Sequence, residues 1–334
     1  MRHVCLLLAT LLAVGIPLRS AGITFTGSTG PGKGKRVVLI AGDDEYHSEE
    51  MLPQLAKILA VEHGFTCTVL FSIDPKTGTI DPHEQRNIPG MEALGSADLV
   101  ILFTRFRDLP DDQMKYFVDY VNSGKPIIGI RTATHAFELK SSPTYAQYSW
   151  NSTTPGWEGG FGRRVLGETW IAHHGHHGKQ STKAIVVPAE AGNPILQGIQ
   201  SGAIWVPTDV YEIRLPQPPS CTPLLLGEVL SGMQPDSPPV NGKQNDPMLP
   251  VAWTNSYTGT SGKPSRIFAT TMGSADDLEN ESLRRLLVNA AYWAAGLEKQ
   301  ISASSKVDLV GTYRPRSFLD ETYTHGLRPE DLRK

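Results

Sequence analysis

The chain has 334 residues, of which 40% are hydrophobic, so it can form one large or two modest domains with a buried core. Its formal net charge of −3 gives no electrostatic reason to expect nucleic acid as a partner.

Residues 1–21 have the pattern of a secretory signal peptide. Arg2 and His3 give a short basic start, residues 4–18 are apolar, and Ser20 and Ala21 offer a cleavage site. The apolar run is too short for a convincing spanning helix, although an uncleaved N-terminal anchor is the alternative. No later stretch is long and apolar enough to cross a bilayer. We therefore expect an extracytoplasmic protein, periplasmic or secreted, with no membrane span after cleavage.

Cysteine usage is sparse. Cys5 lies in the expected signal, which leaves Cys67 and Cys221 in the mature chain. One disulfide between them is possible in an oxidising compartment, but the spacing does not decide it.

Apolar strands and amphipathic helices alternate after a polar lead-in at 22–35. Ser48 is expected to cap the first helix, whose first turn holds Glu49 and Glu50. A second helix begins near Asp108 and ends at Gly124. The strands expected in this half cover residues 37–41, 66–71, 99–103 and 126–130.

The second half begins with a chemically dense insertion at 139–181, rich in Ser, Thr, Gly, Trp and His. A late helix with an apolar stripe starts near Leu283 and is closed by Gly296. The strands expected here cover residues 184–187, 224–229, 249–253 and 266–270.

This alternation predicts an α/β fold, a flavodoxin-like three-layer sandwich with a mostly parallel central sheet. The expected domain covers residues 36–301 and carries the long insertion. Residues 302–334 are expected to be a docked C-terminal tail.

Four of the ten histidines fall within five residues, His173-His174-Gly175-His176-His177. Imidazole is the commonest metal ligand in proteins, and the glycines at 175 and 178 exclude a regular helix. A loop that holds a divalent ion is one interpretation, and a solvated histidine-rich loop is the other. Spacing does not choose the ligands, but we favour His174 and His177 first, then His173. Zinc needs about three protein ligands, and a harder ion such as manganese favours carboxylates.

Two polar loops directly follow expected strands. Residues 42–47 follow the first strand and residues 131–135 follow the fourth. Ligands in open α/β sheets bind beyond the carboxyl ends of the strands, where these loops are expected to meet. Each residue also has a structural interpretation: an acid can cap a turn, Arg131 can serve only as an ion-pair partner, and His135 can be a core histidine.

A family resemblance rests on several segments together. Residues 125–132, Lys-Pro-Ile-Ile-Gly-Ile-Arg-Thr, resemble the strand and elbow of class I glutamine amidotransferase-like domains, whose nucleophilic cysteine is replaced here by Arg131. Thiolate glutaminase chemistry is therefore not expected. Over residues 36–298 the chain is similar to the ThuA-like (trehalose utilisation) family on that scaffold, in a bacterial, secreted branch. The segments that carry this similarity are 42–46, 129–135, 173–177, 208–212, 250–253, 270–273 and 289–293.

The resemblance implies a small-molecule carbohydrate as partner, in particular an oxidised (3-keto) glucoside or disaccharide. Chemistry at such a ketone needs a base and a group that stabilises an oxyanion, and a histidine, a carboxylate, an arginine or a metal can serve. The residues expected to be catalytic are His135, Arg131, Asp44 and Glu45. Those expected to bind substrate are Asp43, Tyr46, Asp209, Tyr211 and Thr271. No nucleotide cofactor is expected.

The leading hypothesis is thus an exported carbohydrate-active enzyme with histidine- or metal-assisted acid–base catalysis. The alternative is a non-catalytic sugar-binding or accessory subunit on an inactivated scaffold, and a homo-oligomer is possible in either case. Ordinary glycoside hydrolysis is weaker, because no flanking pair of carboxylates is evident beyond Asp43 and Asp44. Tryptophans at 150, 157, 170 and 205 surround the insertion and can stack on sugars or pack in the core.

Overall fold

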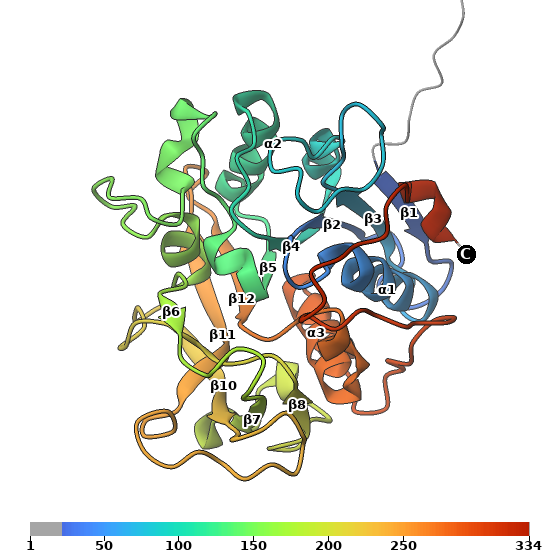
Figure 1. Ribbon diagram of the computed structural model, residues 1–334. Helices are drawn as coiled ribbons and strands as arrows, with labels where there is room; N and C mark the ends of the chain where they lie inside the picture. The colour runs from blue at the N-terminus through green and yellow to red at the C-terminus, as the bar shows by residue number, and fades with distance from the viewer. Residues whose placement is uncertain (1–21, 334) are drawn as a thin grey trace, which may run out of the picture.

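The computed structural model describes residues 22–333 as an α/β fold around one ten-stranded sheet (Figure 1). The strand order is β1-β3-β2-β4-β5-β12-β11-β10-β7-β8. The strands are β1 (Gly22–Thr26), β2 (Arg36–Gly42), β3 (Thr66–Phe71), β4 (Leu99–Thr104), β5 (Ile127–Ile130), β7 (Thr182–Val186), β8 (Ile204–Val206), β10 (Thr222–Val229), β11 (Leu249–Thr258) and β12 (Pro264–Thr270). The short strands β6 (Ala172–His173) and β9 (Tyr211–Glu212) form a separate ribbon.

The sheet has a parallel core. Strands β3, β2, β4, β5 and β12 pair in parallel, in the flavodoxin-like order that the alternation predicts. The outer strands pair antiparallel, so the sheet as a whole is mixed. Strand β11 returns directly to β12 through the short turn between residues 258 and 264, and a turn this short permits only antiparallel pairing.

Three helices cover the two faces of the sheet: α1 (Ser48–Val61), α2 (Asp111–Asn122) and α3 (Glu281–Ala294). Alternate residues of β2 enter opposite layers, since Leu39 packs with α1 and α3 while Ile40 packs with α2. The three-layer prediction is confirmed. The insertion adds Phe161 and Leu166 to the α2 layer, and the tail adds Phe318 to the other.

Two local expectations differ from the structure. Residues 22–26 of the lead-in form β1, an edge strand paired with β3 that buries Ile23. Ser48 begins α1 without capping it; the cap position is His47, and the Ser48 hydroxyl accepts a hydrogen bond from the Asp43 backbone N–H at 2.9 Å. The Ser48 hydroxyl therefore stabilises the sharp turn after β2 and not the first turn of α1.

Three further expectations concern the cysteines, the N-terminal signal and membrane spans. Cys67 and Cys221 are free, and they lie in layers on opposite faces of the sheet. The expected signal at 1–21 is outside the described residues. Within residues 22–333, no helix has the length and hydrophobicity to cross a bilayer.

Candidate functional site

The loops after β2 and β5 meet, as predicted. The Thr132 hydroxyl donates a hydrogen bond to Asp43 Oδ2 at 2.6 Å. The loop after β4 joins them, since Arg105 lies 3.1 Å from Asp44 Oδ1 and 2.9 Å from Glu45 Oε2. Strand β4 lies between β2 and β5, so the carboxyl ends of three parallel strands converge on one place.

Backbone strain is concentrated at the same place. Within residues 22–333, the non-glycine residues with positive φ are His47 (54°), Phe106 (48°) and Arg131 (45°). Each follows the carboxyl end of a parallel strand. Such conformations cost free energy and cluster at functional sites. Arg131 stands directly after β5, at the strained turn that resembles a nucleophile elbow.

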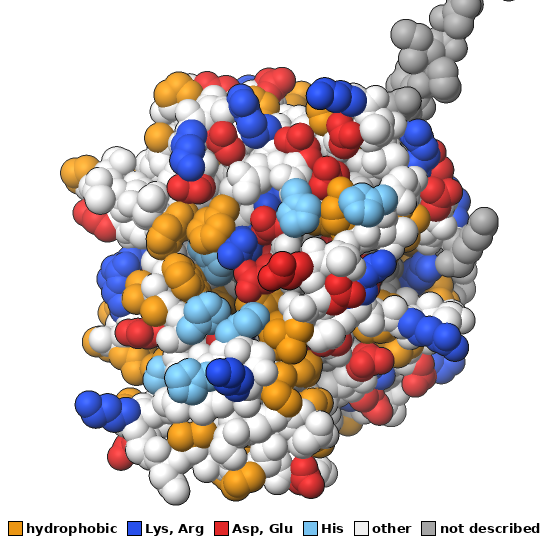
Figure 2. Space-filling model, viewed as in Figure 1, with side chains coloured by type: hydrophobic (Ala, Val, Ile, Leu, Met, Phe, Trp, Pro, Cys, Tyr) orange, Lys and Arg blue, Asp and Glu red, His pale blue; other side chains and the backbone are white. Residues whose placement is uncertain are grey.

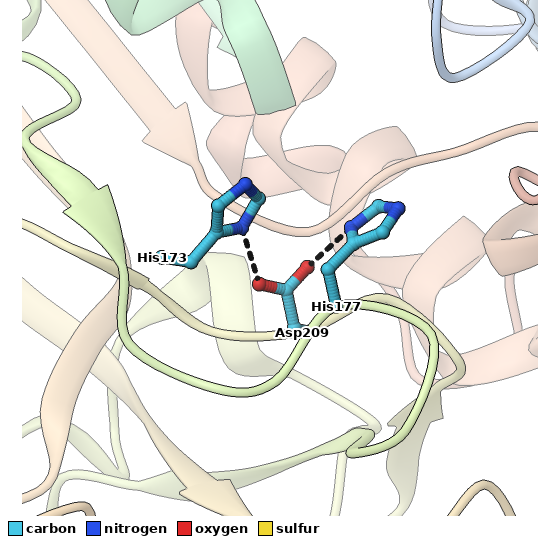
Figure 3. A group of neighbouring side chains, drawn as sticks. All are labelled: His173, His177 and Asp209. Carbon is cyan, nitrogen blue, oxygen red and sulfur yellow. Dashed lines mark hydrogen bonds and ion pairs between the residues drawn. The ribbon is translucent and has the colours of Figure 1, made fainter.

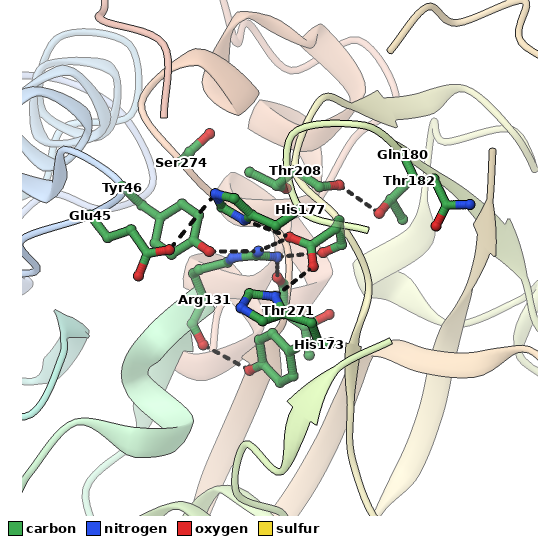
Figure 4. A network of polar contacts seen from close by, with 12 residues as sticks. Glu45, Tyr46, Arg131, His173, His177, Gln180, Thr182, Thr208, Thr271 and Ser274 are labelled. Atoms are coloured by element: carbon green, nitrogen blue, oxygen red, sulfur yellow. Dashed lines mark hydrogen bonds and ion pairs between the residues drawn. The ribbon is translucent and has the colours of Figure 1, made fainter. Parts of the chain in front are cut away.

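Arg131 is a buried anchor. It is 1% exposed, and its guanidinium donates hydrogen bonds to the Thr271 carbonyl at 2.6 Å, the Asp209 carbonyl at 2.7 Å and Asp209 Oδ1 at 2.8 Å (Figure 4). It also donates to the Tyr46 hydroxyl at 3.1 Å. These contacts tie together the loops that adjoin β2, β5, β9 and β12. Both terminal nitrogens are therefore engaged by the protein, while the buried Nε has no hydrogen-bond partner among residues 22–333.

Asp209 holds two histidines of the block. Its carboxylate lies between the rings, 3.0 Å from His173 Nδ1 and 3.4 Å from His177 Nδ1 (Figure 3). Although burial opposes ionisation, the hydrogen bonds from both histidines and the charge of Arg131 hold the pKa of Asp209 well below its usual range. The same hydrogen bond raises the pKa of His173. Asp209 is thus a carboxylate that orients two imidazoles.

The orientation leaves the other ring nitrogens free for a ligand. Nε2 of each histidine points away from Asp209 (Figure 3), and His177 Nε2 lies 4.0 Å from Glu45 Oε1. A histidine that binds a metal commonly gives its second ring nitrogen to a carboxylate in this way. One ring nitrogen of His173, one of His177 and a carboxylate oxygen of Asp209 lie within 4.8 Å of one another, so Asp209 is itself a possible third ligand. Two imidazoles with nearby carboxylates fit zinc or manganese.

The structure does not bring His174 to this group, although we favoured it as a ligand. His174 Nε2 contacts the Gln244 carbonyl at 2.9 Å, and the backbone N–H of His176 bonds to Gln180. The reason is the ribbon of β6 with β9, in which His173 pairs with Tyr211. The pairing ends at His173, which contacts Asp209, and the chain bends at His174, whose side chain contacts Gln244 instead.

A cavity of about 170 Å³ opens beside this group. His135 lies in it against three aromatic rings, with centroid distances of 5.0 Å to Phe106, 5.4 Å to Trp170 and 6.2 Å to Tyr211. Burial, together with the charges of Arg105 and Arg131, holds the pKa of His135 well below its usual range. The cavity is lined by Glu45, Tyr46, Arg105, Phe106, Arg131, Thr132, His135, Trp170, His173 and Tyr211.

A hydrogen-bond chain sets the tautomer of His135. The Tyr211 hydroxyl donates to the Arg131 carbonyl at 2.8 Å, so at the 2.7 Å contact with Thr134 the threonine hydroxyl donates. Thr134 Oγ1 then accepts from His135 Nδ1 at 3.3 Å. This leaves Nε2 of the neutral imidazole as the basic nitrogen.

The three acidic residues of the loop after β2, Asp43, Asp44 and Glu45, differ in their burial and in their partners. Asp43 is fully buried and accepts hydrogen bonds from the backbone of Glu45 and Tyr46; burial and the charge of Asp44 raise its pKa to about 6. Asp44 is paired with Arg105 and, at 3.5 Å, with Arg107. Of the three acids in this loop, Glu45 alone lines the cavity. Thr271 is buried outside it and contributes its carbonyl to Arg131.

Sequence reasoning missed Arg105 and Phe106. Both line the cavity and follow β4 directly. The rule that selected the loops after β2 and β5 applies equally to this third strand. The sequence also does not distinguish Trp170, which lines the cavity, from the other three tryptophans near the insertion.

The C-terminal tail reaches the rim of the site. Phe318 stacks on Tyr46 at 6.1 Å between centroids and meets the edge of His177 at 5.0 Å. The tail is held by an ion pair between Arg316 and Glu50 and by a 3.1 Å contact from His47 Nε2 to the Ser317 carbonyl. On the viewed face, histidines gather beside hydrophobic side chains near the centre (Figure 2).

The contact between His47 and the tail predicts a pH dependence of stability. Burial lowers the pKa of His47, but the hydrogen bond and charge of Glu49 outweigh it and raise the pKa from 6.5 to about 9. The stabilisation is therefore complete below pH 6.5 and is lost as the pH rises through about 9. We expect the free energy of unfolding to fall by roughly 1–2 kcal/mol across this window. Urea unfolding should show this loss in the native protein and in a His83→Gln control, because His83 is exposed. An undiminished loss in His47→Gln would contradict the assignment.

Comparison with known proteins identifies the family. The sequence profile of the ThuA family, described as trehalose utilisation, matches residues 36–294. The fold is similar to a ThuA-like protein from Parabacteroides merdae, with 17% identity, coverage of 79% of this chain and 90% of that one, and a TM-score of 0.48. A ThuA-like protein from Bacteroides uniformis gives 16% identity, 80% and 94% coverage, and 0.47. A search of curated proteins found no match. Because the profile covers most of the chain, this protein belongs to the ThuA family, which is implicated in trehalose utilisation.

Proposed function

We propose that this protein is an exported enzyme that acts on an oxidised (3-keto) glucoside or disaccharide by acid–base catalysis. The observation that carries the proposal is one cavity in which His135 and the Asp209-anchored His173 both form part of the lining. Aromatic walls suit the apolar faces of a sugar ring, and the polar groups suit its hydroxyls. The trehalose context of the family supports a carbohydrate substrate.

The chemistry follows from the acidity of a C–H next to a ketone. In the proposed reaction, Nε2 of neutral His135 would remove that proton, and His173 would protonate or polarise the oxygen as charge develops there. Arg105, which also lines the cavity, adds positive charge at its rim. In an isomerisation, the proton taken from carbon returns to the neighbouring carbon of the enediolate. In an elimination, the glycosidic C–O bond breaks and the proton passes to the leaving oxygen.

A divalent metal would be held by His173 and His177, with Glu45 beside them. When bound there it would polarise the sugar carbonyl. Asp209 would then orient the ligands and would not need to contact the ion, since its oxygens already accept hydrogen bonds from Arg131 and both histidines.

The proposal is tested by incubating the purified protein with 3-keto-trehalose and a 3-keto-glucoside, with and without chelator. We expect turnover, and a loss of about 10²–10⁴-fold in kcat/KM for His135→Gln and for His173→Ala. His174→Ala is the matched control from the same block and should retain activity. No turnover of either compound, even with added zinc or manganese, would count against an enzyme.

A sugar-binding accessory role is the second candidate. The position that resembles a nucleophile elbow is occupied by Arg131, whose terminal nitrogens all contact protein groups. Sugar binding that survives both His135→Gln and His173→Ala, without turnover, would favour this role.

A further inference from the structure

A second cavity adjoins the candidate site. It has a volume of about 430 Å³, and Trp170 contributes to its wall and to that of the 170 Å³ cavity. The outer cavity is lined by Trp150, Asn151, Ser152, Thr153, Glu158, Gly159, Thr169, Trp170, Ile171 and Arg214. Most of these residues come from positions 150–171, the part of the insertion that precedes the histidine block.

Aromatic rings connect the two cavities. Trp150 lies 5.8 Å from Trp170 and 5.5 Å from Phe106 between ring centroids. Phe106 in turn lies 5.0 Å from His135 in the inner cavity. Phe106 and Trp150 thus form a continuous series of ring contacts from His135, the proposed base, to the outer cavity.

The other lining groups suit a polyhydroxylated ligand. Amide and hydroxyl side chains at 151–153 can donate and accept hydrogen bonds, and Glu158 and Arg214 add charged partners.

We propose that the outer cavity is a second sugar subsite, in which Trp150 and Trp170 receive the ring that is linked to the reacting one. This rests on the proposed function of the inner cavity. The other two tryptophans of the group have different roles: Trp157 packs on Tyr148 at 4.5 Å between ring centroids, and Trp205 of β8 donates a hydrogen bond to Ser181 Oγ at 3.1 Å. The subsite would make the protein selective for two-ring over one-ring carbohydrates.

Calorimetry with 3-keto-glucose and 3-keto-trehalose tests the subsite. We expect the two-ring compound to bind about tenfold or more tightly, and Trp150→Ala to abolish that preference while the one-ring affinity stays within about twofold. Asn151→Ala, at an exposed position, should weaken only two-ring binding and provides a milder second variant. Trp157→Ala is the control, because Trp157 lines neither cavity.

The outcomes separate the two proposals. Equal affinity for one- and two-ring compounds in the native protein, or equal weakening of both by Trp150→Ala and Asn151→Ala, overturns the second subsite and leaves the inner site standing. Absence of binding by either compound overturns both.

Discussion

Replacement of Arg131 by methionine is expected to lower the free energy of unfolding by about 3–5 kcal/mol. The substitution removes one partner of a buried ion pair and leaves Asp209 charged at 1% exposure. It also deprives the carbonyls of Thr271 and Asp209 of their donor. Urea or thermal unfolding measures the loss.

Arg266→Met is the matched control for Arg131→Met. Its charged partner is Glu298, both side chains are more than a third exposed, at 44% and 35%, and Arg266 also donates a hydrogen bond to the Trp293 carbonyl. A surface pair of this kind contributes about 0–1 kcal/mol. If Arg131→Met were no more destabilising than this control, Arg131 would not be the anchor that its contacts indicate.

Asp209→Asn is expected to have the largest effect on activity, with kcat/KM for a 3-keto-glycoside falling roughly 10²–10⁴-fold. The amide keeps the shape of the carboxylate but cannot hold two Nδ1–H groups, so both imidazoles lose their orientation and tautomer. The affinity for zinc or manganese, measured by calorimetry, should fall about 10–100-fold in the same variant.

Asp277→Asn is the control for loss of a buried acid in the same region. Asp277 accepts hydrogen bonds from the Thr208 hydroxyl at 2.6 Å and the Gly273 N–H at 2.7 Å, and the structure records no contact with a histidine. We expect it to change stability more than kcat/KM. Equal loss of activity in the two variants, at equal folded fraction, would assign Asp209 a merely structural role.

Much of the fold could be predicted because its signals are local. Continuous apolar runs mark β2, β4 and β5, and the periodic stripe of Met114, Phe117 and Val121 marks α2. Strand β1 was missed because a five-residue edge strand with a single fully buried side chain, Ile23, has almost no pattern of its own. The tail also lacks periodicity, and the position of Phe318 against Tyr46 depends on contacts 272 residues apart.

The sequence by itself determined where the candidate site lies. Polar loops after buried parallel strands, with a dense histidine block nearby, were sufficient because the geometry of a parallel sheet brings strand ends together. Only the tertiary structure decided which groups face the cavity. The pairing of β6 with β9 holds His173 against Asp209, whereas His174, just after β6, contacts Gln244. Arg131 is held in the core by Tyr46, Asp209 and Thr271, which come from three other segments. Side-chain direction in a loop depends on which distant backbone it pairs with, and no local spacing encodes that.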